Sequence, residues 1–148
     1  MVPLVVLLTS FLLLSLLGHF GPFSYGWWTS LRLSLSAMFL LTASAHWGSR
    51  RQDLIQMVPP VFPRADLLVT ATGILEILGA VGLMIPAAAP YAALGLCLLL
   101  IAMFPANVHA GRQHLTIAGR QVPRLLPRTL IQLVFIAAAA VVALGADW

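Results

Sequence analysis

The chain has 148 residues, of which 61% are hydrophobic and 8% are charged, and its mean hydropathy is +1.00. This composition predicts an all-α integral membrane protein, and it leaves no room for a large extramembrane catalytic domain. All eight basic residues are Arg, and six of them lie in or beside two polar loops. That pattern fits membrane topology better than nucleic-acid binding. Cys97 is the only cysteine, which excludes an intrachain disulfide and a multi-cysteine metal site.

Five apolar runs predict five membrane-spanning helices. Each run is close to the length of about 17 to 25 residues that a helix needs to cross a bilayer. The runs are Val2 to Gly18, Leu31 to Trp47, Leu67 to Ile85, Tyr91 to Val108 and Leu125 to Ala146. The first run has two interpretations, an additional span or a cleaved signal peptide. The span is favoured because no basic segment precedes the run and no convincing cleavage site follows it.

Loop charge predicts the orientation. The segment Gly48 to Asp66 carries three Arg against one Asp before its last residue, and the segment Ala106 to Arg124 carries three Arg. The segments Gly18 to Ser30 and Pro86 to Pro90 carry no Arg, Lys, Asp or Glu. By the positive-inside rule, the first two loops are cytoplasmic. The N-terminus is then inside and the C-terminus outside.

A short surface helix is expected within the first cytoplasmic loop. The segment Asp53 to Val58 has apolar residues at helical spacing, and Pro59-Pro60 should end it. The next span is expected to begin near Asp66, because an acidic residue is suited to the N-terminus of a helix.

Glu76 is the most informative polar residue, because it lies in the middle of an apolar run. It is about 13 Å from either end of that run at 1.5 Å per residue. A carboxyl at this depth is costly unless it is neutral, paired or beside a watered cavity. Small residues share its helix face, which predicts close packing toward other helices. Two interpretations stay open, a ligand- or proton-handling group and a hydrogen bond that joins two helices.

Arg128 and Gln132 are four residues apart and share a face of the last span. Alone, Arg128 would be taken as an anchor at the headgroups. The predicted topology also brings His46, Asn107 and His109 to the same half of the membrane. These residues and Glu76 are therefore the candidate substrate-binding set, and they could form one polar pocket.

Pro105 interrupts the fourth span, because it has no N–H to donate to the helix. The helix should kink or end near Asn107, and the irregular backbone could line a cavity or simply mark a helix terminus. His46, His109 and Glu76 lack the local spacing of a metal motif. No metal site is expected from the sequence, and no catalytic residue can be assigned.

Four segments resemble the DoxX-like family of small bacterial membrane proteins: LTASAHW, MVPPVFPRADLLVTATGILEILGAVGLMIP, MFPANVHA and LPRTLIQ. The resemblance implies a multi-pass protein of the bacterial inner membrane. It also implies a four-helix bundle over residues 31–146, to which residues 1–30 add a helix and an outer loop within a single domain of residues 1–148. The motif positions carried over are His46, Pro59-Pro60, Glu76, Asn107, Arg128 and Gln132.

The resemblance also suggests a redox context, since some relatives are linked to membrane electron transfer and one is a subunit of a thiosulfate:quinone oxidoreductase. This chain has no haem motif, cysteine pair or nucleotide loop, so redox chemistry would need a borrowed cofactor such as a quinone, or a partner protein. Whether the protein is an enzyme stays open.

Three hypotheses follow for the function. The first is a small subunit whose pocket binds a quinone or another amphipathic molecule in a redox-associated complex. The second is a non-catalytic assembly partner of other membrane proteins, and the third is a small-molecule or proton carrier. Small residues on several spans also permit a homo-oligomer.

Overall fold

The computed structural model describes residues 2–22, 24–113, 116–117, 119–121 and 125–145, and it confirms an all-α architecture. The helices in chain order are α1 (Val2–Phe20), α2 (Trp27–Ser44), α3 (Arg51–Met57), α4 (Ala65–Met84), the 3-10 helix η1 (Pro86–Ala88), α5 (Ala89–Ala102), α6 (Phe104–Arg112) and α7 (Leu125–Leu144). The one departure among the described residues is a small antiparallel pair of two-residue strands, β1 (Thr116–Ile117) and β2 (Arg120–Gln121).

Four described helical segments are long and apolar enough to cross a membrane: α1, α4, the run Pro86–Arg112 and α7. Helix α2 is not among them, although it has 18 residues. Its sequence includes Arg32 and several serines, and these polar residues reduce its hydropathy. Arg32 and three of the serines are buried, so α2 holds polar side chains inside the protein. A fifth span therefore stays a prediction.

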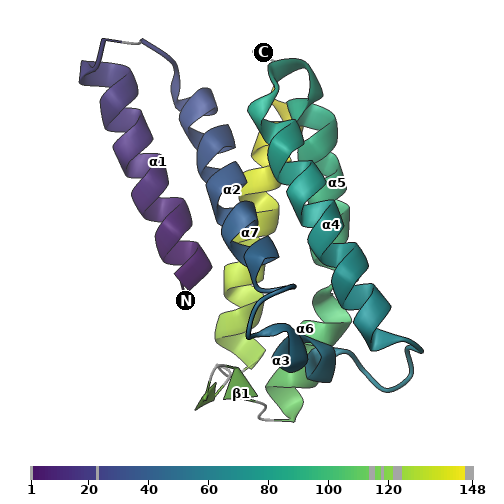
Figure 1. Cartoon of the computed structure of the whole chain (residues 1–148). Coiled ribbons are helices and arrows are strands. Elements are labelled where there is room, and N and C mark those ends of the chain that lie inside the picture. Colours follow the sequence, from purple (N-terminus) through teal and green to yellow (C-terminus); the bar gives the residue numbers. More distant parts are fainter. Residues whose placement is uncertain (1, 23, 114–115, 118, 122–124, 146–148) are drawn as a thin grey trace.

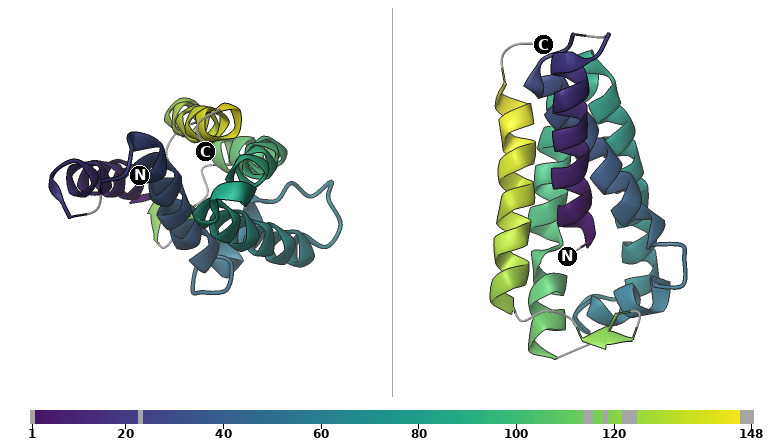
Figure 2. Two further views of the ribbon diagram at one scale, coloured as in Figure 1. Left: turned by 90° about the horizontal axis from the view of Figure 1, so that it is seen from above. Right: turned by 90° about the vertical axis from the view of Figure 1, so that its left-hand side faces the viewer.

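The long helices lie side by side and alternate in direction (Figure 1). Helix α2 packs against α4, α4 against α5, and α5 against α7. Helix α1 packs against α2 on the outside of this group, and its start lies toward the end of the molecule where α3, α6 and β1 gather (Figures 1 and 2). The described parts of both arginine-containing loops lie at that same end (Figure 1).

The apolar core lies between α2, α4, α5 and α7. Its largest fully buried apolar side chains are Phe39, Leu35, Met38, Leu83, Leu96 and Val142. Cys97 is buried in this core, as expected for a small core residue. Many other large apolar side chains of the long helices face outward, as expected for helices surrounded by lipid rather than water.

The first arginine-containing loop agrees closely with its prediction. The expected surface helix is α3, which ends at Met57, two residues before Pro59. Helix α4 begins at Ala65, directly before Asp66. Arg64 precedes it with a left-handed backbone (φ 58°), so the chain turns sharply into the helix.

The prediction that the second arginine-containing loop begins at Ala106 was wrong, because Ala106 lies within a helix. Helix α5 ends at Ala102, Met103 interrupts the helix, and a second helix, α6, continues to Arg112. Pro105 lies in the first turn of α6, where a missing backbone N–H costs nothing. Asn107 and His109 are therefore helical residues. Arg124 lies outside the described residues.

Candidate functional site

Five of the six predicted site residues line a single cavity of about 300 Å³, which we call the polar cavity. They come from the turn after α2, from α4, from α6 and from α7: His46, Glu76, Asn107, Arg128 and Gln132. The start of α1 closes part of the cavity with Val2 and Pro3. His109 is the exception, because it is half-buried on α6 and lines none of the described cavities.

A chain of hydrogen bonds joins the polar residues of α6 and α7. The Arg128 Nη2 group donates to Asn107 Oδ1, and Asn107 Nδ2 donates to Gln132 Oε1 at 2.8 Å. Gln132 Nε2 in turn donates to the carbonyl of Leu100, close to the break between α5 and α6. The chain therefore connects three helices and satisfies a backbone carbonyl next to the interruption.

Glu76 is 3% exposed and is hydrogen-bonded to α2, so the predicted inward direction of its side chain is confirmed. Its Oε2 lies 2.7 Å from Thr42 Oγ1, which also lies 3.0 Å from the carbonyl of Phe39. The hydroxyl has one hydrogen. It either donates to the Glu76 carboxylate, or donates to Phe39 and accepts from a protonated Glu76. Both arrangements tie the carboxyl to α2 at the edge of the polar cavity.

Close packing around Glu76 involves Gly73, one turn earlier on α4. A Cβ at Gly73 would lie 2.7 Å from His46 Cβ and 2.8 Å from a ring carbon of Trp47. Only glycine allows the turn after α2 to approach α4 this closely. The small residue therefore positions His46 against the cavity.

His46 is buried, and its Nδ1 lies 3.2 Å from the carbonyl of Thr42. A carbonyl only accepts, so Nδ1 carries the hydrogen and Nε2 is left as an acceptor in the neutral ring. Burial lowers the pKa of His46, and the nearby Arg51 cation lowers it further, against the raising effect of backbone hydrogen bonds. The neutral imidazole is therefore the stable form at neutral pH.

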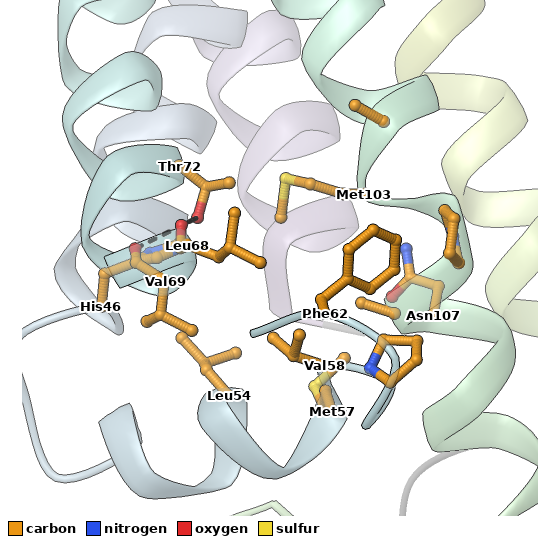
Figure 3. A pocket seen from close by; sticks show the side chains of 14 residues that line it. His46, Leu54, Met57, Val58, Phe62, Leu68, Val69, Thr72, Met103 and Asn107 are labelled. Carbon is orange, nitrogen blue, oxygen red and sulfur yellow. Dashed lines mark hydrogen bonds between the residues drawn. The ribbon is translucent and has the colours of Figure 1, made fainter. Parts of the chain in front are cut away.

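A second, apolar cavity of about 320 Å³ adjoins the polar one, and we call it the apolar pocket (Figure 3). Its walls come from α3, the loop after α3, the start of α4 and the break between α5 and α6. The two cavities share five lining residues: His46, Leu54, Met57, Met103 and Asn107. Together they form a region with polar groups on one side and apolar groups on the other.

The apolar pocket opens at the surface between α4 and the end of α5. Phe62 is 43% exposed and Leu68 is 39% exposed, although both also line the pocket. Pro105 and Ala102, on the opposite wall, are exposed as well. A molecule with an apolar chain could therefore enter from the side of the bundle.

Two contributing residues were missed from the sequence. Thr42 is hydrogen-bonded to Glu76. The only indication of this in the sequence was that a residue with a hydroxyl group lies one helical turn before His46. Arg51 donates to the carbonyls of His46 and Asp66 and to the hydroxyl of Thr70, so it holds the turn after α2 against α4. Nothing in the sequence separates Arg51 from the other loop arginines.

Within the described part of the chain, no group of three or more His, Cys, Asp or Glu residues is placed to hold a metal ion. The polar cavity instead offers hydrogen-bond donors from Arg128, a carboxyl from Glu76 and an acceptor nitrogen from His46. This set can orient and hydrogen-bond the polar end of a small molecule.

Comparison with known proteins gives one family and no named relative. No curated protein and no solved structure matches the chain. A family model matches residues 35–143, which include α3 to α6, all but the last residue of α7 and the second half of α2, and leave α1 outside. The matched range contains every residue of the candidate site named above except Val2 and Pro3. The chain therefore belongs to the family described as a domain of unknown function, DUF8561.

Proposed function

We propose that this protein is a small subunit of the bacterial inner membrane that binds an amphipathic molecule, such as a quinone, between its helices. It crosses the membrane five times with the N-terminus inside, and its four-helix part is DoxX-like. The polar cavity lies in the cytoplasmic half of the membrane. The complex in which it acts is redox-associated, with other membrane proteins as partners.

One observation carries the proposal: polar residues distant in sequence converge on a cavity that adjoins an apolar pocket. Each cavity has a volume near the lower limit of about 300 Å³ for small-molecule sites, and together they exceed it. Polar groups inside a membrane protein are costly, and they characteristically mark ligand or ion sites. The side opening at Phe62 and Leu68 gives such a molecule a route from the lipid phase.

The proposed roles follow from the atoms available. Arg128 and Gln132 donate hydrogen bonds to an oxygen of the ligand, and Glu76 accepts or donates one on the α4 side of the cavity. The neutral His46 offers Nε2 as an acceptor where the two cavities meet. For a quinone, these groups would hold the ring oxygens while the apolar chain extends into the apolar pocket.

The proposal is tested by what co-purifies with the protein. Wild-type protein, Glu76→Gln and the control Asp66→Asn are purified in a mild detergent, extracted with solvent and analysed by mass spectrometry. Asp66 is an exposed carboxyl on the same helix, which makes its amide variant a matched control. We expect one amphipathic molecule per chain in wild type and control, and its loss in Glu76→Gln. An empty wild-type protein would contradict the proposed ligand binding. Equal retention of the molecule in Glu76→Gln would contradict the proposed role of Glu76.

A second function, structural support within a membrane complex, is favoured by the hydrogen-bond chain from Arg128 to the carbonyl of Leu100. In this alternative the polar residues fasten helices together and bind no ligand. Replacing Glu76 with Leu would remove the Thr42 contact and lower the free energy of unfolding by about 1 to 3 kcal/mol, whereas Glu76→Gln would be mild. Unfolding of both variants in detergent measures this, and an unchanged Glu76→Leu stability would exclude the support role of Glu76.

A further inference from the structure

The charge of the polar cavity indicates which class of ligand head group it favours. Two arginines, Arg50 and Arg128, and a single carboxyl, Glu76, line it. That carboxyl is hydrogen-bonded to Thr42 and forms no ion pair with either arginine among the described residues. The cavity therefore has an excess of positive charge.

Arg128 has hydrogen-bonding capacity that the protein does not use. Its Nη2 is bonded to a neutral amide, Asn107, and its Nε is buried without a hydrogen-bond partner. A guanidinium has five N–H donors in a planar fork. Arg128 is half-buried and forms no ion pair among the described residues. A cation withdrawn from water without a counter-charge is unfavourable, particularly among apolar helices, and an anion beside it reduces that cost.

We infer that the ligand is a single-chain amphiphile with an anionic oxygen head group, a carboxylate or a phosphate, held by Arg128 with its chain in the apolar pocket. This inference rests on the proposed function and adds the head-group class to it. A carboxylate or phosphate presents two oxygens at the spacing of the guanidinium fork. A single chain fits because the apolar pocket has only about 320 Å³ and is open at Phe62 and Leu68.

The head group is tested with defined probes on the full chain in detergent micelles. Binding of radiolabelled palmitate, dodecyl phosphate, methyl palmitate and decylubiquinone is measured to wild type and to Arg128→Gln, Arg128→Lys and Arg112→Gln. Arg112 is an exposed arginine on α6 that lines none of the described cavities, so it is the matched control. We expect saturable binding of palmitate or dodecyl phosphate, and the one that binds identifies the source as an acid or a phosphate ester. Affinity should fall by about tenfold or more in Arg128→Gln and by less in Arg128→Lys, which keeps the charge but not the fork. It should be unchanged in Arg112→Gln.

A further variant covers the case in which Arg128→Gln disturbs its contact with Asn107. Ala45 lines the polar cavity and its methyl side chain makes no hydrogen bond, so Ala45→Phe fills the space and leaves the polar groups in place. We expect it to abolish binding of the anionic probe while gel filtration stays normal. Binding of the anionic probe that survives in Ala45→Phe would overturn the inference.

The outcomes separate this inference from the function on which it rests. If decylubiquinone or methyl palmitate binds as tightly as the anionic probes, the anionic head group is wrong while a ligand site remains. If no probe binds and the protein purifies empty, both the inference and the proposed function fail. If an anionic probe binds equally to wild type and Arg128→Gln, Arg128 is not the group that holds it and the inference is overturned.

Discussion

Asn107 is the central member of the hydrogen-bond chain, and its replacement tests whether that chain stabilises the bundle. Asn107→Leu keeps a side chain of similar size and removes two hydrogen bonds. One comes from the Arg128 guanidinium, and the other goes to Gln132 Oε1 at 2.8 Å. The variant therefore leaves Arg128 Nη2 without its acceptor and Gln132 Oε1 without its donor.

The magnitude follows from those two bonds. A hydrogen bond to a charged group contributes about 1.5 to 3 kcal/mol and a neutral one about 0.5 to 1.5 kcal/mol in water-soluble proteins. Interhelical hydrogen bonds measured within membranes are weaker and average about 0.6 kcal/mol. Asn107 is half-buried near the end of the bundle, so we expect the free energy of unfolding to fall by about 1 to 3 kcal/mol.

The assay is unfolding by SDS in mixed micelles, followed by circular dichroism, with Gln113→Leu as the control. Gln113 is an exposed amide directly after α6, so its replacement should be nearly neutral. Gln132→Leu combined with Asn107→Leu should cost less than the sum of the two single variants, because both remove the same bond. A loss below about 0.5 kcal/mol for Asn107→Leu, or an additive double variant, would refute the stabilising role of the chain.

Three further predictions concern the turn that carries His46. Gly73→Ala should lower the midpoint of thermal unfolding, because the new Cβ would lie 2.7 Å from His46 Cβ and this clash outweighs a gain of about 1 kcal/mol in helix propensity. An unchanged or higher midpoint would contradict this reasoning. The pKa of His46 is lowered in the folded protein, so the unfolded chain binds the proton more strongly and stability falls as the pH drops below about 6.5. The midpoint of thermal unfolding should therefore decrease with decreasing pH in wild type, and this decrease should be absent in His46→Gln. Arg51→Gln removes three hydrogen bonds and should reduce stability by about 1 to 2 kcal/mol in the same assay, whereas Arg50→Gln, which lacks these bonds, should not.

The parts of the fold that depend on local sequence were predictable. Apolar runs located α1, α2, α4 and α7 to within four residues at each end, whereas the fourth run extended six residues past the end of α5. Pro59-Pro60 located the end of α3. The inward direction of Glu76 followed from the cost of a charged group in lipid and from the small residues on its face. These inferences need only the chain near each residue.

Features that depend on contacts between helices were not predictable in the same way. Pro105 predicted an interruption, but a proline is equally compatible with the end of one helix and the first turn of another. The structure shows the second case, which places Asn107 on α6 facing Arg128 and Gln132. The bond between Thr42 and Glu76 joins residues 34 positions apart, and no local pattern indicates it.

The most direct test of the central claim, that the two cavities form one ligand site, is photoaffinity labelling. A fatty acid and a short-chain ubiquinone analogue, each with a diazirine on the apolar chain, are irradiated with the protein, and labelled peptides are mapped by mass spectrometry. We predict that labels concentrate on residues of the apolar pocket such as Met57, Phe62 and Met103 and are lost in Ala45→Phe. Labels spread over outward-facing residues such as Leu8 and Leu133, unchanged by that substitution, would contradict the account.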